Sequence, residues 1–363
     1  MKIIKQLSLW MLICCFYFDN LILSLFLIAF FLVSFLINKI KKIHLFLLFL
    51  IGFFYLVFIA YIYKNESFDF LNVWINKILT FDLRNKINEY FVNIHGTQTG
   101  SFLSLILLNI KNNQNINLYY KLVDLSVVHL IVISGYHINI FCFLILKIFF
   151  KFPKTGKILC IVFSFFISYL NGFSPSTIRI FLSLIFYSFN KTKNYSTDLS
   201  IIAIALIAPK VISSFGLCMS FLGARGVKLF AVIKEKNILY NTFFTSFFAI
   251  IYIVPYIAML NNQMSLWGIF FGILFTPIFT IIYLLSLLFS WWMTFSIMFQ
   301  FTYQFINNIS QTLNNMNIFI EINFLTNWWI IGFYYSLIEF FNLFLKHKRK
   351  VKKWYLKDLK ENY

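Results

Sequence analysis

Most of the chain consists of apolar runs separated by short polar or basic clusters. A helix rises ~1.5 Å per residue, so about 20 apolar residues cross a hydrocarbon core of ~30 Å. Apolar runs of roughly that size occupy residues 3–18, 21–36, 45–63, 126–150, 158–170, 177–190, 199–222, 240–260, 265–288, 290–306 and 328–345. The pattern predicts an all-α polytopic integral membrane protein with about 10–12 transmembrane or re-entrant helices.

The composition supports this fold class and the basic residues give it an orientation. Of the 363 residues, 61% are hydrophobic and 12% charged, and the mean hydropathy is +0.82, which excludes a large water-soluble domain. Basic clusters lie at residues 39–42, 151–157, 191–193, 225–236 and 346–353. The positive-inside rule places these clusters in the cytoplasm, so we expect a multi-pass protein of the plasma membrane with a cytoplasmic C-terminus. This topology also explains much of the net charge of +19.

The runs divide the chain into four parts. Residues 1–63 form an N-terminal membrane hairpin region of about three spans, and residues 64–100 form an extracellular segment with an amphipathic helix over 70–91. Residues 101–345 form the membrane core, in which Pro209 splits one apolar run into two half-spans. Residues 346–363 form a basic tail, which we expect to attract anionic lipid. A nucleic acid or a partner protein is the alternative ligand of the tail.

Several kinds of chemistry find no support in the sequence. The five cysteines are scattered through apolar runs without paired spacing, so we expect small buried side chains rather than disulfides or a zinc site. A Gly-rich nucleotide loop, a metal-binding His-Glu-x-x-His and a Gly-x-Ser-x-Gly nucleophile motif do not occur. We therefore predict no metal, no cofactor, no catalytic residue and no enzymatic activity in this chain.

Polar residues inside apolar runs are the candidate functional groups. The first set, His129, Ser134, Gly135 and His137, puts two imidazoles and a Ser-Gly step within nine residues of an apolar run. Such groups line an internal polar surface, or they form a helix-packing notch with satisfied core histidines. The sequence leaves both interpretations open.

The second set lies in Asn171-Gly-Phe-Ser-Pro-Ser-Thr-Ile-Arg179. Ser174, Ser176 or Thr177 is suited to cap a helix that begins near Pro175. Arg179 then lies one turn inside an apolar helix, where a guanidinium costs at least ~2.5 kcal/mol unless it reaches phosphate, water or a partner. Snorkelling to the outer headgroups is the alternative explanation for Arg179.

The third set follows Pro209, where Gly216, Ser220 and Gly223 recur at helical spacing. A kinked half-helix with small residues on one face can line a cavity. Close helix packing is the alternative role for Gly216 and Gly223.

The order of these three sets resembles the membrane core of the ComEC family of bacterial DNA-internalisation channels. That family has a His-Leu-x-x-x-Ser-Gly-x-His stretch, then Gly-x-Ser-Pro-Ser-x-x-Arg, then Gly-Phe-Gln-Leu-Ser-Phe. The first two match here from His129 to His137 and from Gly172 to Arg179, and the resemblance covers roughly residues 72–290. In the third, Leu217 and Cys218 stand where the family usually has Phe and Gln.

The resemblance implies a channel for inward transport of single-stranded DNA during competence and transformation. The expected DNA path is lined by His129, Ser134, Gly135, His137, Ser174, Ser176, Arg179 and Ser220. Longer family members carry an OB-type domain and a metallo-β-lactamase-like domain, which residues 64–72 and 346–363 are too short to hold. The expected partners are therefore single-stranded DNA, membrane lipid, and a separate DNA receptor, nuclease and cytoplasmic motor.

Two other functions stay open at this point. One is a transporter for nucleotides or other small anionic metabolites, and the other is a structural membrane anchor that acts through its basic tail. An oligomer is compatible with each of the three.

Overall fold

The computed structural model describes most of the membrane core and parts of the N-terminal region. The described residues are 2–19, 28, 42–64, 83–127, 135–189, 195–212, 214–230, 238–261, 263–321, 334, 337, 338 and 341. The predicted spans at 21–36 and 328–345 lie almost entirely outside these residues, and the basic tail lies wholly outside them.

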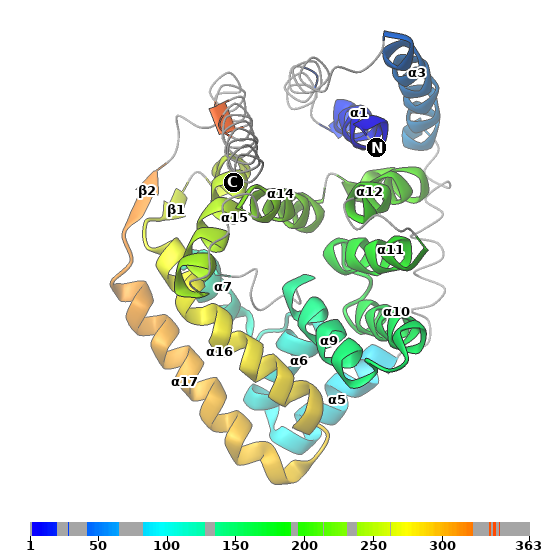
Figure 1. Ribbon diagram of the computed structural model, residues 1–363. Coiled ribbons are helices and arrows are strands. Elements are labelled where there is room, and N and C mark those ends of the chain that lie inside the picture. Colours follow the sequence, from blue (N-terminus) through cyan, green and yellow to red (C-terminus); the bar gives the residue numbers. More distant parts are fainter. Residues whose placement is uncertain are drawn as a thin grey trace, which may run out of the picture.

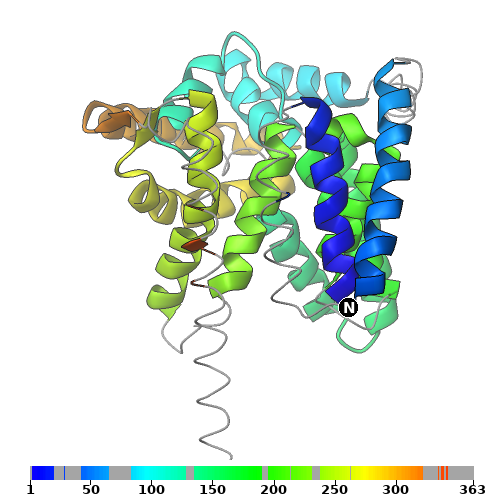
Figure 2. The same cartoon turned by 90° about the horizontal axis from the view of Figure 1, so that it is seen from above.

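The N-terminal region packs onto the first half of the interrupted run through three helices. These are α1 (Lys2–Asp19), α3 (Lys42–Lys64) and α12 (Ser196–Ile207). Figure 2 shows α1 and α3 upright and side by side. Tyr55 of α3 donates a hydrogen bond to the carbonyl oxygen of Ala205 at 2.6 Å, and its hydroxyl lies 3.1 Å from the sulfur of Cys15. One tyrosine therefore joins all three helices.

The second and third sets of polar residues lie on or beside three helices, α11 (Pro175–Phe189), α13 (Pro209–Ile212) and α14 (Phe215–Phe230). Helices α9 (Gly135–Ile148) and α10 (Pro153–Leu170) pack beside α11. The predicted break at Pro209 is confirmed, because α12 ends at Ile207 and Ala208 leaves the helical conformation with φ −146° and ψ 70°. The helical region is sterically disfavoured for a residue that precedes proline. The helix start at Pro175 is also confirmed.

The segment after the N-terminal region folds into three short helices. They are α5 (Leu83–His95), α6 (Thr97–Leu108) and α7 (Ile116–Asp124). An amphipathic helix is found over 83–95, with Ile87, Phe91 and His95 on its buried face, whereas residues 70–82 of the predicted helix lie outside the described residues. Helix α6 is buried along nearly its whole length. Gly100 allows α6 to lie against the α5 backbone, because an added Cβ there would be 2.5 Å from the Cα of Val92.

The C-terminal half departs from the sequence-based expectation at two points. Its elements are α15 (Ile238–Asn261), β1 (Gln263–Ser265), α16 (Gly268–Phe289), the 3-10 turn η2 (Met293–Phe295), α17 (Ser296–Asn315) and β2 (Phe319–Glu321). The bounds predicted for the span at 290–306 are wrong, because residues 290–295 form a turn and the helix, α17, begins at Ser296 and is amphipathic and uncharged.

Strands β1 and β2 pair antiparallel, with Met264 opposite Ile320. The described residues are therefore mainly helical, in agreement with the predicted all-α class, and one short two-stranded ribbon is added to the helices. Ser265 fixes the ribbon by a hydrogen bond of 2.6 Å from its hydroxyl to the side-chain oxygen of Asn317.

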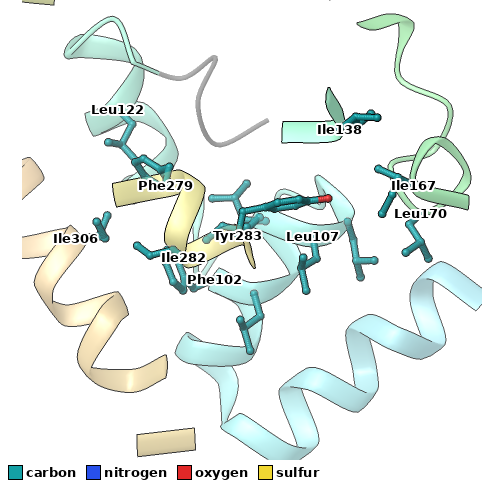
Figure 3. Close-up of a cluster of buried hydrophobic side chains, with 14 of the residues drawn as sticks. Phe102, Leu107, Leu122, Ile138, Ile167, Leu170, Phe279, Ile282, Tyr283 and Ile306 are labelled. Atoms are coloured by element: carbon teal, nitrogen blue, oxygen red, sulfur yellow. The ribbon is translucent and has the colours of Figure 1, made fainter. Parts of the chain in front are cut away.

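Buried side chains form two large hydrophobic clusters on either side of α11. The N-terminal cluster includes Cys14, Cys15, Leu48, Tyr55, Ile59, Ile178, Ile201, Ile204, Ile212 and Leu217. The core cluster, part of which is drawn in Figure 3, includes Phe91, Phe102, Leu107, Leu122, Ile138, Ile167, Ile180, Phe275, Phe279, Tyr283, Phe299 and Ile306. Figure 1 shows α10, α11 and α12 in a row, with α1 and α3 beyond α12 and with α16 and α17 on the opposite side.

Within the described residues, two helical stretches are long and apolar enough to cross a membrane, Pro153–Leu170 and Phe270–Phe289. The larger number of spans expected from the sequence stays a prediction.

Candidate nucleic-acid path

Arg179 and Ser220 come from different sequence motifs and lie in contact. The Nε atom of Arg179 donates a hydrogen bond to the hydroxyl oxygen of Ser220 at 3.1 Å, across 41 residues of sequence. Arg179 lies one turn after the start of α11 at Pro175, and Ser220 lies on α14. The structure therefore brings the second and third predicted sets together at one point.

The guanidinium of Arg179 is buried, with only 8% of the residue exposed. In the part of the chain that the structure describes, the bond to Ser220 is its only hydrogen bond, and no carboxylate lies within ion-pair distance. Four N–H donors on the two terminal nitrogens are thus available to another group. Because the side chain is enclosed, this geometry does not favour snorkelling to lipid headgroups.

Helix α11 places Arg179 between the two hydrophobic clusters. Ile178 belongs to the N-terminal cluster and Ile180 to the core cluster. Successive helical residues are rotated by about 100°, so Arg179 emerges between these two apolar faces. The surroundings of the charge are consequently of low polarity, which strengthens its attraction for an anion.

The turn before α11 requires glycine at position 172. Gly172 has φ +63° and Phe173 has φ +51°, and a Cβ on Gly172 would lie 2.8 Å from Nη1 of Arg84. Arg84 in turn donates from Nε and Nη2 to the carbonyl oxygen of Leu108, at 3.1 and 2.8 Å, and from Nη2 to that of Asn109 at 3.1 Å. These are carbonyl groups at the end of α6, which a cation satisfies well.

Arg84 was missed in the sequence analysis. Its only sequence signal is an arginine at the beginning of an amphipathic helix, which ordinarily indicates a solvated face. In the structure its guanidinium is half-buried against the glycine turn, and this desolvation lowers the pKa of Arg84 from its ordinary value. The group stays charged at neutral pH and joins α5, α6 and the turn.

The hydroxyl groups at the start of α11 interact mainly with one another. The hydroxyl of Ser174 lies 3.0 Å from that of Thr177 and 3.4 Å from that of Ser176, and Thr177 donates to the carbonyl oxygen of Ser174 at 2.8 Å. Ser174 thus occupies the helix start, as predicted, but its side chain bonds to hydroxyls. These residues form a small polar cluster one turn before Arg179.

Half of the first predicted set can be placed. Gly135 begins α9, and His137 is 2% exposed with its ring centroid 5.1 Å from that of Tyr283 on α16. His129 and Ser134 lie outside the described residues. The structure therefore places His137 against α16, whereas Arg179 lies against α14.

The predicted packing role of the glycines on α14 is corrected in one case. An added Cβ on Gly216 meets nothing within 4 Å, whereas one on Gly223 would lie 3.3 Å from Ile253 of α15. The closest contact is at Gly226, where a Cβ would lie 2.7 Å from the Cα of Ala249 and nearer still to the carbonyl oxygen of Phe248. Gly216 is therefore not a packing residue, and Gly226 is.

The cysteines are small buried side chains, as predicted, because all five lie in the interior. Among the residues that the structure describes, no group of three or more His, Cys, Asp or Glu side chains is arranged to hold a metal ion.

Comparison with known proteins assigns the family. The model of the Competence protein family matches residues 106–348, about two thirds of the chain. This chain therefore belongs to the Competence protein family, in agreement with the ComEC-like order of its motifs. The family is one of membrane proteins and is linked to competence, the uptake of DNA.

Two curated proteins are similar to part of the chain. "Uncharacterized protein MG316" of Mycoplasma genitalium is 32% identical over 171 residues, which are 46% of this chain and 44% of that protein. Its homolog in Mycoplasma pneumoniae is 32% identical over 137 residues, which are 37% of this chain and 36% of that protein. The matched part thus spans less than half the length of these relatives. No solved structure matches.

Proposed function

We propose that this chain is a membrane channel core for the inward transport of single-stranded DNA during DNA uptake. The observation that carries the proposal is Arg179, a buried guanidinium with one neutral hydrogen-bond partner and no carboxylate partner among the described residues. A buried cation needs a compensating anion or water, and DNA supplies one negative charge per nucleotide.

The geometry suits transient binding of a phosphate group. Ser220 fixes the Nε side of the guanidinium, so the two terminal nitrogens keep a constant direction toward a ligand. A single arginine attracts a phosphate strongly enough to admit it and weakly enough to release it, which conduction requires. Ser174 and Ser176 lie one turn away, and we assign His129, Ser134, Gly135 and His137 to another part of the same path.

The proposal includes partners outside this chain. The channel core performs no bond-making chemistry, so a receptor delivers the DNA, a nuclease produces the single strand and a cytoplasmic motor completes the transport. The protein crosses the plasma membrane several times, and the basic residues 346–353 face the cytoplasm and anionic lipid.

The test is the entry of end-labelled DNA into a nuclease-protected space in cells that depend on this protein. Arg179→Gln should abolish protected single-stranded product, and Arg179→Lys should retain part of it because the charge is kept. The matched control is Arg225→Gln, which removes an arginine that stacks on Phe221 of α14 at 5.0 Å. Membrane abundance of each variant is measured in parallel.

Uptake that Arg179→Gln leaves unchanged at normal abundance would refute the proposal. Equal losses in Arg179→Gln and Arg225→Gln would also refute it, because a general loss of positive charge would then explain the effect.

A transporter for nucleotides or other small phosphate-bearing metabolites is the second candidate. The same observation favours it, because one guanidinium with four free donors suits a single phosphate group. Competition separates the two functions: a DNA channel is blocked by long single strands with a steep salt dependence, whereas a metabolite carrier saturates with mononucleotides.

A further inference from the structure

One face of α16 carries a row of buried hydroxyl groups. Tyr283 is 3% exposed, and Ser286 and Ser290 are completely buried. Among the described residues, none of the three hydroxyl oxygens has a hydrogen-bond partner. The spacing i, i+3, i+7 puts all three on the same side of the helix.

This behaviour differs from that of other hydroxyls on the same helix. Thr276 and Thr280 each donate to a carbonyl oxygen one turn earlier, which is the usual solution for a hydroxyl in an apolar helix. A buried hydroxyl without a partner is unfavourable, and each such group requires a physical explanation. Three such hydroxyl groups on one face of a helix indicate that they bind a shared ligand, rather than that each is separately unsatisfied.

Each end of the row lies beside a buried histidine. At one end, the ring centroid of Tyr283 lies 5.1 Å from that of His137. At the other end, Nε2 of His95 donates to the carbonyl oxygen of Ser290 at 2.7 Å, and Nδ1 of His95 lies 2.6 Å from the hydroxyl of Ser296. The distance along α16 from Tyr283 to Ser290 is about 10 Å.

Helix α6 contributes one more group of the same kind. Ser104 is completely buried, and its hydroxyl has no partner among the described residues. Helices α6 and α16 are in contact, and Figure 3 shows Leu107 of α6 near Tyr283, whose hydroxyl points to the side on which Ile138 and Ile167 lie. Ser104 precedes Leu107 by three residues and so lies on the same side of α6, one turn nearer to His95.

We propose that this face of α16, together with Ser104, binds a chain of ordered water molecules that links His137 to His95. The steps from Tyr283 to Ser286 and from Ser286 to Ser290 rise about 4.5 and 6 Å along the helix. A water that makes two hydrogen bonds of ~2.8 Å joins two oxygens up to about 5.6 Å apart, so a short chain of waters can join hydroxyl groups spaced along this face. The hydroxyls and the serine carbonyl supply the two to four polar partners that a buried water needs.

The water chain is a separate inference from the proposed transport of DNA. It predicts a hydrated seam inside the core cluster, between α6, α9 and α16. Rows of polar side chains joined by water commonly form proton relays in membrane proteins.

Radiolytic hydroxyl labelling tests the occupancy directly. An X-ray pulse produces hydroxyl radicals from bound water, and mass spectrometry measures the oxidation of nearby rings in the full-length protein in detergent. The matched reference is Tyr252 on α15, which is also 3% exposed but lies in a different cluster, beside Phe248. We expect Tyr283 to be oxidised at least several-fold faster than Tyr252. Equal, low rates for the two tyrosines would overturn the proposal.

Substitution of Ser286 tests the proposed water chain independently. Ser286→Ala should lower the oxidation of Tyr283 and lower the Tm, because a water would lose one of its partners. Ser200→Ala is the control, since Ser200 is equally buried but donates to the carbonyl oxygen of Thr197 at 2.7 Å. It should leave the oxidation of Tyr283 unchanged. A Tm that rises in Ser286→Ala with unchanged oxidation of Tyr283 would show a dry, unpartnered hydroxyl and would refute the water chain.

Discussion

The contact at Gly226 leads to a quantitative prediction about how α14 is held. In Gly226→Ala, the new methyl carbon would lie 2.7 Å from the Cα of Ala249, whereas ordinary van der Waals contact begins at 3.4 Å. The methyl carbon is fixed to the α14 backbone and meets backbone atoms of α15, so the two helices would have to separate by roughly 1 Å, which forfeits about a quarter to a half of the dispersion attraction across the contact. Overpacking of this kind costs about 1–3 kcal/mol, and the higher helix propensity of alanine offsets up to ~1 kcal/mol.

We therefore expect Gly226→Ala to lower the free energy of unfolding by about 1–2 kcal/mol. Gly216→Ala is the matched control, because it makes the same substitution on the same helix where nothing lies within 4 Å. It should be neutral or stabilising by up to ~1 kcal/mol. The assay is thermal unfolding of the purified protein in detergent at one scan rate, with Tm as the readout.

The separation of the helices also has a functional consequence. Ser220 lies less than two turns before Gly226 on α14, so a displaced α14 weakens the hydrogen bond between Ser220 and Arg179. If Gly226→Ala is as stable as Gly216→Ala, the close backbone contact between α14 and α15 does not exist in the protein, and this account of the position of Ser220 is wrong.

Three further predictions concern the turn before α11 and the N-terminal helices. Arg84→Gln removes the donors to the last carbonyl groups of α6 and should lower the free energy of unfolding by about 1–3 kcal/mol in a denaturant titration. Arg84→Lys should recover less than half of that loss, because an ammonium does not reproduce the fork of donors, and full recovery would show that charge alone suffices. Gly172→Ala should cost at least ~1–2 kcal/mol by the same measurement, because its φ of +63° is left-handed, so a neutral result would contradict the turn geometry. Tyr55→Phe removes one hydrogen bond, should cost about 1 kcal/mol and should speed thiol labelling of Cys15, whereas unchanged labelling would argue against the contact between α1 and α3.

Local signals predicted much of the fold correctly. Proline chemistry located the start of α11 and the break after α12, because proline acts on its immediate neighbours. The apolar periodicity located most helices. The apolar run at 290–306 did not predict the bounds of α17. The apolar residues of this helix are interspersed with uncharged amides, and an average hydropathy over the run does not separate the two kinds of residue. The ribbon of β1 and β2 was missed because its pairing joins segments more than 50 residues apart.

The candidate site was predictable as a set of residues but not as an arrangement. Arg179 and Ser220 were identified from polarity and motif order, yet their contact depends on how α11 crosses α14. Arg84 and Gly226 were missed because their importance comes from the backbone that each one approaches. The hydroxyls of α16 carried a usable signal, since Tyr283, Ser286 and Ser290 fall on one face of an otherwise apolar helix.

The position of α11 between two hydrophobic clusters implies an order of assembly during synthesis. The described members of the N-terminal cluster lie between residues 9 and 218, so that cluster can close before the last hundred residues are made. The core cluster has members from residue 87 onward but needs Phe275, Phe299 and Ile306, so its earlier members wait for α16 and α17 to leave the ribosome. At that stage Ile178 already fixes one side of helix α11 in the N-terminal cluster. The opposite side, with Ile180, is available for packing by the later members of the core cluster. The nascent chain would thus complete the N-terminal cluster first, and the core cluster would then pack against a helix that is already in place.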